Sequence, residues 1–329
     1  MWAAGYNAYG QLGDGSTEDK NTFIKVVDSN AHSVATGALS SFYVKNDGSL
    51  WATGCNSNGQ LGIHSDKNQS SFVRVNSGGV MAVASGFAHT LQLGLDGSVL
   101  VTGSNKYGQL GDYSEIDVRS FILVVVLGAS AVSAGHSHSM ILFGNGDVFT
   151  AGSNMHGQLG DDTKDKTRRS YFEKVTGGAI AVVAGSFHSM VLKNDGSVWT
   201  SGANYFGQLG DGTTIEKTVF QPVISSGAVA VAAGYAHSVV LKDDGSVWAT
   251  GSNQFGQLGS STENRLSFFQ SIAGGVEEVA AGDYNTMVKT TDGDLWAVGF
   301  NRHAQLGDGS TVNSEVFVNV VDTDGMCYL

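Results

Sequence analysis

The sequence predicts an all-β protein, a seven-bladed β-propeller built from seven repeats of about 49 residues. The string GQLG, or a close relative, occurs seven times at steps of 49, 49, 49, 50, 49 and 48 residues, which indicates one supersecondary unit used throughout. No segment shows a 3.6-residue apolar period of helical length. The first and last repeats are as typical as the middle ones. A closed ring is therefore favoured over an open solenoid, which needs polar capping repeats.

Each repeat is recognised by four landmarks. The first is a large residue, at Trp2, Trp51, Leu100, Phe149, Trp199, Trp248 and Trp296. Ten residues later comes the leucine of the GQLG box, at Leu12, Leu61, Leu110, Leu159, Leu209, Leu258 and Leu306. A phenylalanine then marks a short strand, and a glycine opens a segment of the form A-G-x-x-H-S. Asp-Gly pairs such as Asp195-Gly196 predict the hairpin turn that follows, because glycine accepts the positive φ of such turns.

The repeat runs from end to end, so we expect a single propeller domain over residues 1–329. Counting landmarks predicts that the closing blade is incomplete. From Phe317 the next landmark glycine falls at position 331, beyond Leu329, so about fifteen residues are missing: one strand and its hairpin turn. This suggests a fragment of a longer protein. An incomplete blade leaves unpaired backbone groups, and we expect it to favour edge-strand association with another chain.

Charge and composition exclude several classes of partner. The formal net charge is −12, and an acidic surface repels phosphate, so we expect no nucleic acid. The only basic run consists of Lys164, Lys166, Arg168 and Arg169. No apolar run is long enough to span a bilayer, so we expect no membrane. Cys55 and Cys327 lack metal-ligand spacing and are expected to be free thiols, which favours an intracellular, cytoplasmic location, with the nucleus as the alternative.

The pattern W-A-x-G-x-N-x-x-G-Q-L-G, with A-G-x-x-H-S upstream, resembles the repeat of the regulator of chromosome condensation family. It is carried by WATGCNSNGQLG at 51–62, WTSGANYFGQLG at 199–210 and AGYAHS at 233–238. The resemblance covers nearly the whole chain and implies a seven-bladed propeller. Members of the family act as exchange factors for small GTPases, chromatin binders, a photoreceptor, ubiquitin-ligase modules or an enzyme inhibitor, so the resemblance fixes no function. The exchange factor's β-wedge insertion has no counterpart here, because the one insertion is two residues long.

Most polar residues that recur in the repeats are interpreted as structural. The histidines after the landmark glycine are His89, His138, His188 and His237. A ring of histidines could bind metal, but we expect them to tie adjacent strands by hydrogen bonds. The aspartates after the box are expected to accept local backbone N–H groups rather than to bind calcium. The invariant asparagines and box glutamines are likewise expected to hold turns. Ser139, Ser189 and Ser238 each follow a histidine, but neighbours on a strand point to opposite faces, which argues against a Ser–His couple.

The informative residues are those that vary inside this fixed frame. The two positions after the landmark glycine form one such set, and its candidate partner-binding residues are Leu39, Phe87, His136, Phe187, Tyr235 and Tyr284. Aromatic residues at loop positions are typical anchors for a protein partner. Local packing over the neighbouring blade explains this set equally well. A second variable set precedes the box, at Tyr9, Asn58, Tyr107, His156, Phe206, Phe255 and His303, and there packing is the favoured interpretation.

The sequence therefore predicts a non-catalytic protein-interaction scaffold that presents variable propeller loops to a protein partner. The alternative, from the resemblance alone, is a guanine-nucleotide exchange factor for a Ran-like small GTPase. No nucleophile–base pair, phosphate loop or dinucleotide fingerprint is found, so we expect neither an enzyme nor a cofactor. No metal ligand set is predicted.

Overall fold

The computed structural model describes residues 1–27, 30–163, 167–259 and 265–320. The described residues contain strands, turns and loops and no helix, which confirms the all-β prediction. Among them there is accordingly no helix long and apolar enough to cross a membrane. They form two compact units, one within residues 1–18, 25–155 and 165–178, the other within 19–24, 156–164 and 179–329.

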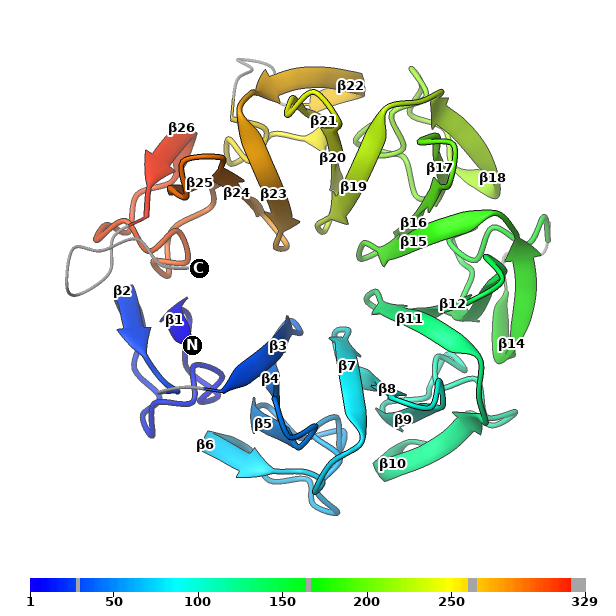
Figure 1. Ribbon diagram of the computed structural model, residues 1–329, viewed down its shortest axis with the longest axis vertical. Helices are drawn as coiled ribbons and strands as arrows, with labels where there is room; N and C mark the ends of the chain where they lie inside the picture. The colour runs from blue at the N-terminus through cyan, green and yellow to red at the C-terminus, as the bar shows by residue number, and fades with distance from the viewer. Residues whose placement is uncertain (28–29, 164–166, 260–264, 321–329) are drawn as a thin grey trace. The chain divides into compact units, whose positions relative to one another are not determined.

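The first unit holds three antiparallel four-stranded sheets in which strands follow one another in chain order, together with the short strand β1 (Trp2–Gly5) (Figure 1). The first sheet consists of β3 (Ala31–Thr36), β4 (Ser40–Lys45), β5 (Leu50–Gly54) and β6 (Gln69–Arg74). The second consists of β7 (Val80–Ser85), β8 (His89–Gly94), β9 (Val99–Gly103) and β10 (Val118–Val125). The third consists of β11 (Ala129–Ala134), β12 (His138–Phe143), β13 (Val148–Ser153) and β14 (Arg168–Thr176).

The second unit repeats this arrangement with three further sheets, and it holds most of β2 (Lys20–Lys25). Its first sheet consists of β15 (Ala179–Ala184), β16 (His188–Lys193), β17 (Val198–Gly202) and β18 (Lys217–Ile224). The second consists of β19 (Ala228–Ala233), β20 (His237–Lys242), β21 (Val247–Ser252) and β22 (Arg265–Ala273). The third consists of β23 (Val276–Ala281), β24 (Asn285–Thr290), β25 (Leu295–Gly299) and β26 (Ser314–Asn319).

The expectation of seven blades is not confirmed, because the described residues form six four-stranded sheets. The two other described strands, β1 and β2, belong to none of these six sheets. The reason is that the sequence repeat and the sheet begin at different strands. A repeat counted from its large residue covers the third and fourth strands of one sheet and the first two strands of the next. There are seven large residues but six landmark glycines, at Gly37, Gly86, Gly135, Gly185, Gly234 and Gly282. The closing blade was expected to lack one strand, whereas the described residues contain neither of the two strands that would flank a seventh landmark glycine. Edge-strand association stays a prediction.

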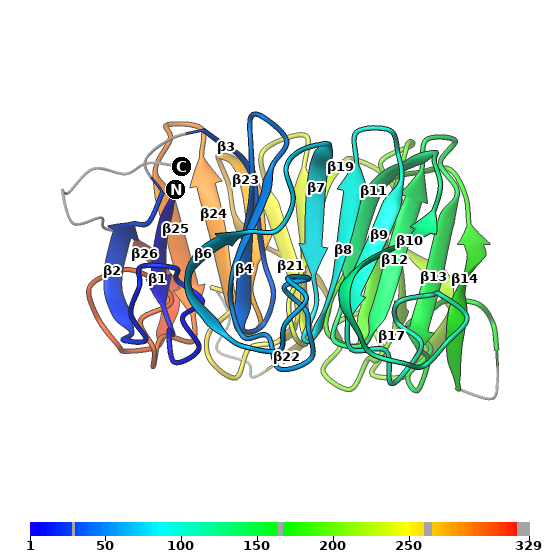
Figure 2. The ribbon, with the colours of Figure 1, turned by 90° about the horizontal axis from the view of Figure 1, so that it is seen from below.

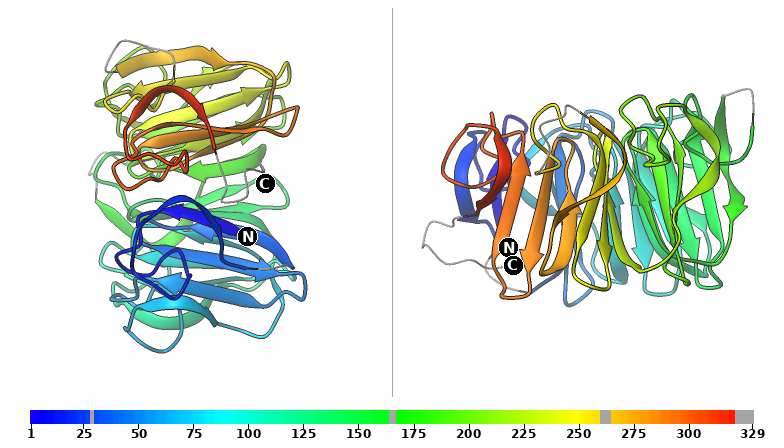
Figure 3. Two further views of the ribbon diagram at one scale, coloured as in Figure 1. Left: turned by 90° about the vertical axis from the view of Figure 1, so that its left-hand side faces the viewer. Right: turned by 90° about the horizontal axis from the view of Figure 1, so that it is seen from above.

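Within each unit the sheets stand beside one another and are held by their first strands. In the first unit β7 contacts both β3 and β11, and Figure 2 shows β7, β8 and β11 running side by side. In the second unit β19 contacts both β15 and β23, and Figure 3 shows the neighbouring yellow and orange sheets. The core lies between adjacent sheets, where the box leucines are buried; Leu61, Leu110 and Leu209 are fully enclosed. Leu61, Leu110, Leu258 and Leu306 each belong to an apolar cluster of buried side chains.

The phenylalanine landmark locks neighbouring sheets together. Gly210, which closes a box, has a positive φ of 74°, and a Cβ built on it would lie 2.5 Å from the ring of Phe269 on the next sheet. Gly307 stands in the same relation to Phe23 of β2, at 2.3 Å. No side chain can occupy these positions without displacing the ring, because real Cβ contacts do not come so close. The box glycine and the landmark phenylalanine of another repeat therefore pack directly against each other.

The Asp-Gly hairpin prediction is confirmed. Gly196 has a φ of 76°, in the region that favours glycine. Asp195 Oδ1 accepts hydrogen bonds from the Ser197 backbone N–H at 2.9 Å and from the Ser197 hydroxyl at 2.6 Å. These bonds lower the pKa of Asp195, because they favour its charged form. The turn joins β16 to β17 in the register His188 opposite Gly202, which places His188 at the end of the sheet that carries the variable loop.

Candidate functional site

The six candidate residues all lie in the short loops between the first and second strands of the six sheets. Leu39 and Phe87 lie in the loops after β3 and β7, and the others occupy the equivalent place, at His136, Phe187, Tyr235 and Tyr284. Phe87 has 46% of its surface exposed, and the other five are partly exposed. All six therefore sit at the surface of their own loop, as the sequence pattern predicted.

The loop is shaped by the glycine and histidine that flank the variable pair. A Cβ on Gly185 would lie 2.3 Å from His188 Cε1, so the histidine ring fills the space that a larger residue would need. The backbone φ of this glycine is not in the left-handed region, so space and not conformation requires it. Neighbouring loops are also joined, since Tyr235 N–H donates to the backbone oxygen of Asp283 at 2.9 Å. The variable side chains are thus presented from a fixed backbone.

The histidines tie adjacent sheets, whereas they were expected to tie adjacent strands. His188 Nε2 lies 2.8 Å from Ser238 Oγ of the next sheet, and that hydroxyl donates to Gln208 O at 2.7 Å. Because the hydroxyl proton goes to the carbonyl, Nε2 carries the ring proton and donates it. The same relay runs from His89 through Ser139, and from His237 through Thr286.

A Ser–His hydrogen bond thus exists between repeats although none forms within a strand. These residues are fully buried. Burial lowers the pKa of His188 to about 3 and the pKa of His89 and His237 to about 4, so the rings stay neutral near pH 7. A hydroxyl that already donates to a carbonyl and faces no solvent has no access to a substrate. The relay is structural.

The recurrent amide and carboxylate groups hold the box turn, as expected. Asn204 Oδ1 accepts from Leu209 N–H at 3.0 Å, and its amide donates to Asp211 Oδ1 at 3.0 Å and to Thr213 O at 3.1 Å. Asp211 Oδ1 in turn accepts from Thr213 N–H at 2.9 Å. The described residues contain no cluster of three or more histidine, cysteine or acidic side chains placed for a metal ion. Lys164, Lys166 and Cys327 lie outside the described residues.

In the first unit, two of the three candidates meet. Phe87 and His136 stack with ring centroids 4.3 Å apart and an interplanar angle of 26°. Burial lowers the pKa of His136, so this ring is neutral near pH 7. Leu39 belongs to the neighbouring loop, whose Ala38 N–H approaches Gly86 O at 3.4 Å. The result is a small apolar patch on adjacent loops.

In the second unit, all three candidates form one row. Phe187 and Tyr235 meet edge to face at 5.5 Å between centroids, and Tyr235 lies 5.2 Å from Tyr284. The row continues into Phe255, 5.3 Å from Tyr284, and Phe300, 5.0 Å from Phe255. Distances of this size are those of directly interacting aromatic pairs. The sequence set therefore converges in space, and we call these five residues the aromatic row.

Two members of the row were not among the candidates. Phe255 belongs to the set before the box, where packing was favoured. Phe300 follows Gly299 at a position where five of the seven repeats have alanine, cysteine or serine. Comparing the repeats with one another would therefore have shown that a large ring at this position is unusual. Its N–H donates to Tyr284 O at 2.9 Å, which fixes it beside the loop of Tyr284.

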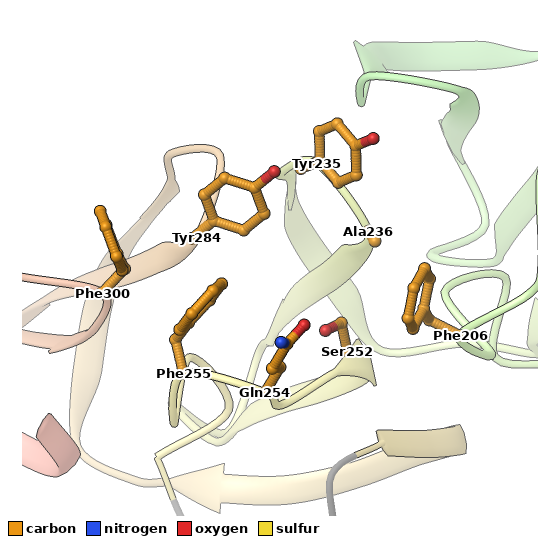
Figure 4. Close-up of a pocket in the computed structure, with 8 residues that line it drawn as sticks. All are labelled: Phe206, Tyr235, Ala236, Ser252, Gln254, Phe255, Tyr284 and Phe300. Atoms are coloured by element: carbon orange, nitrogen blue, oxygen red, sulfur yellow. The ribbon is translucent and has the colours of Figure 1, made fainter. Parts of the chain in front are cut away.

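A cavity of about 230 Å³ opens beside the aromatic row (Figure 4). Its lining is Phe206, Tyr235, Ala236, Ser252, Gln254, Phe255, Tyr284 and Phe300. Ser252 and Gln254 lie between Phe206 on one side and Phe255 on the other. The box glutamines place both of these rings, because Phe206 N–H donates to Gln208 Oε1 at 3.1 Å and Phe255 N–H donates to Gln257 Oε1 at 2.9 Å.

The electrostatics of the cavity are set by neutral rings and one neighbouring carboxylate. No charged side chain lines it. Burial raises the pKa of Tyr284, as do Tyr235 and Asp283 nearby, so its hydroxyl stays protonated. Asp283 precedes Tyr284. The residue as a whole is exposed, but neighbouring atoms remove part of the water around its carboxyl, and this desolvation raises the pKa of the group. Its carboxylate makes no ion pair or side-chain hydrogen bond with the described part of the chain.

Comparison with known proteins identifies the fold. A family model described as the RCC1-like domain matches residues 1–326. No curated protein sequence matches the chain. Human WBSCR16 is 21% identical with a TM-score of 0.86, covering 97% of this chain and 93% of that one. Prp20p from Saccharomyces cerevisiae, described with its binding properties to Gsp1p and histones, is 18% identical with a TM-score of 0.87, covering 98% of this chain and 86% of that one. At such identities the likeness shows the fold alone, that of a β-propeller.

Proposed function

The chain belongs to the RCC1-like domain family, as its motifs predicted, and we propose that it is a non-catalytic scaffold that binds a protein partner through the aromatic row. The observation that carries this proposal is the convergence of Phe187, Tyr235 and Tyr284 from three different sheets into one partly exposed cluster. Aromatic rings with few rotamers supply large contact areas at low entropic cost, and they dominate the binding energy of protein interfaces.

The absence of a reactive group in the row supports binding over catalysis. Its members are Phe and Tyr, and the burial that raises the pKa of Tyr284 keeps that hydroxyl from acting as a base near neutral pH. The Ser–His relays are enclosed between sheets and have no path to a ligand. The partner is a protein, because the row extends across several loops and offers no phosphate-binding cation.

The test compares capture of partner proteins by three purified forms of the chain. The first is the wild type, and the second carries Phe187→Ala, Tyr235→Ala and Tyr284→Ala together. The third is a matched control with Tyr113→Ala and Tyr171→Ala, a stacked and exposed aromatic pair elsewhere, at 5.6 Å. Circular dichroism checks that all three are folded.

We expect the triple variant to lose a partner that the control retains, with each ring contributing about 2 kcal/mol, a factor of roughly 30 in Kd. Retention of every captured protein by the triple variant would remove the aromatic row as the binding site. Loss by both variants would show that exposed aromatic area, and not this row, carries the binding.

A second candidate function is guanine-nucleotide exchange on a Ran-like small GTPase. The observation in its favour is the fold shared with Prp20p, whose binding to Gsp1p has been described. Such an activity speeds nucleotide release without covalent chemistry. Release of a fluorescent guanine nucleotide from several small GTPases, with and without the chain, decides the matter. Rates equal to spontaneous release in every case would exclude this function.

A further inference from the structure

We propose that the cavity beside the aromatic row binds a methylated ammonium group, the head of a di- or trimethylated lysine side chain on a protein partner. The source of the lysine rests on the proposed function, whereas the chemistry of the cavity does not. The cavity is the one lined by five aromatic rings together with Ala236, Ser252 and Gln254 (Figure 4).

The size of the cavity selects the class of ligand. Pockets that hold whole cofactors or drug-sized molecules measure about 300–1,000 Å³. At about 230 Å³ this cavity is smaller and suits a single side chain. It lies among loops that present a row of partly exposed rings, so a side chain projecting from a docked protein would enter it directly.

The walls of the cavity favour a cation. Aromatic faces attract positive charge through the ring quadrupole, and an arrangement of several rings around a quaternary ammonium is the known use of this effect. Here Tyr284 meets Phe255 at an interplanar angle of 76° and Tyr235 at 36°. The rings that line the cavity are therefore inclined differently to one another.

The shortage of hydrogen-bond acceptors favours methylation. An unmodified lysine ammonium has three N–H donors, and burying them unpaired is costly. Among the side chains of the lining, only those of Ser252, Gln254 and the two tyrosines carry acceptors, all of them neutral, and no carboxylate is present to compensate an ammonium charge. Methyl groups replace the N–H donors while the positive charge remains. The charge can then be desolvated against the rings.

Charge complementarity points the same way. No lysine, arginine or histidine lines the cavity. Asp283 lies next to Tyr284 and close enough to affect the titration of that tyrosine. Its carboxylate has neither an ion pair nor a side-chain hydrogen bond within the described ranges, so it is available to a cation at the rim. The formal net charge of −12 steers basic segments of a partner toward the chain.

The experiment is a titration of the full chain, followed by NMR or calorimetry, with four small probes at one ionic strength. They are tetramethylammonium, N-acetyl trimethyl-lysine amide, the unmethylated amide, and the neutral isostere in which carbon replaces the charged nitrogen. We expect the trimethyl-lysine probe to bind roughly tenfold more tightly than the unmethylated and the neutral probes. Equal affinity for the neutral isostere would overturn the proposal, since the cavity would then be merely apolar. Equal affinity for unmethylated lysine, or binding of none of the probes, would overturn it as well.

Variants locate the binding. Tyr284→Leu and Phe255→Leu keep an apolar wall but remove a ring, and each should weaken binding of the trimethyl-lysine probe several-fold. Asp283→Asn should weaken it less and leave the neutral isostere unaffected. Tyr113→Leu, at a residue with 81% exposure that is not part of the lining, is the matched control and should change nothing. The comparison of probes on the wild-type chain stands even where a variant does not fold.

Failure of this inference and failure of the proposed function are distinguishable. If the probes bind as expected while partner capture is unaffected by the triple variant, the cavity chemistry is right and the docking proposal is wrong. If capture depends on the aromatic row but the cavity does not prefer the methylated cation among the probes, the docking proposal is right and the proposed cavity chemistry is wrong.

Discussion

Acidification should unfold this protein through its inter-sheet histidines before its carboxylates titrate. His89, His188 and His237 are fully buried, and each donates from Nε2 to a hydroxyl of the next sheet. Burial, with smaller contributions from neighbouring histidines at two of the sites, lowers their pKa from 6.5 to about 4, 3 and 4. The folded protein therefore excludes protons that the unfolded chain accepts.

The direction and size of the effect follow from linkage. Above pH 6.5 neither state binds these protons, so the stabilising effect of neutral burial is fully present. As the pH falls from 6.5 towards 4, each histidine is protonated only in the unfolded chain, and stability falls by about 1.4 kcal/mol per pH unit per histidine. Three of them together give about 4 kcal/mol per pH unit, a large part of a typical stability of about 5–15 kcal/mol. The hairpin aspartates, whose pKa values are lowered from 3.8, act only at lower pH.

The assay is urea unfolding followed by circular dichroism at half-unit steps from pH 7 to pH 5. The matched variant is His188→Asn, because Asn285 occupies the same position in the last sheet of the protein itself. We expect this variant to lose the part of the pH slope that His188 contributes, about 1.4 kcal/mol per pH unit. A wild-type stability that stays flat between pH 6.5 and 5, or a variant with the full wild-type slope, would refute the reasoning.

Three further predictions concern the frame. Asn204→Ala removes the acceptor of Leu209 N–H and one of the donors to Asp211, and it should lower the free energy of unfolding by about 2–4 kcal/mol in urea titration. A loss below about 1 kcal/mol would contradict the structural role of this asparagine. Gly185→Ala places a Cβ 2.3 Å from His188 Cε1 and should cost about 1–3 kcal/mol, with a double-mutant cycle against His188→Ala showing less than additive loss; full additivity would rule out the contact. Leu209→Ala empties a fully buried position and should cost about 2–5 kcal/mol, measured as a shift of the urea midpoint at unchanged slope.

The fold was largely predictable because its signals are local or strictly periodic. Asp195-Gly196 needs only its own residues to make a turn, and Leu209 marks a core position by recurrence alone. The expectation of seven blades was not confirmed because the sequence repeat and the sheet are out of phase. The sequence repeat that begins at Trp199 contains the last two strands of one sheet and the first two strands of the next. Period alone does not reveal where a sheet begins, since strand pairing decides that.

The candidate site was predictable only in part, because it depends on contacts between repeats. Phe187, Tyr235 and Tyr284 stood out as variable residues inside a fixed loop, and the structure brings them together. Phe255 lies in the same sheet as Tyr235, 20 residues later in the chain, and meets Tyr284 of the next sheet. Phe300 follows Tyr284 by 16 residues in that next sheet, and its ring contacts the ring of Tyr284. The His–Ser relays were missed for the same reason. The partner of His188 is Ser238 of the next sheet and not the serine that follows it in sequence.

The box glutamine explains how a rigid frame can carry a variable site. In all seven repeats its Oε1 accepts a hydrogen bond from the backbone N–H two residues earlier, at 2.9 to 3.1 Å. The residues that donate are Tyr9, Asn58, Tyr107, His156, Phe206, Phe255 and His303. Since the bond uses the backbone and forms equally well with asparagine, histidine or an aromatic residue, the fold does not require a ring at this position. The rings of Phe206 and Phe255 are therefore not needed for the fold and can serve a binding site. Both of them line the cavity beside the aromatic row.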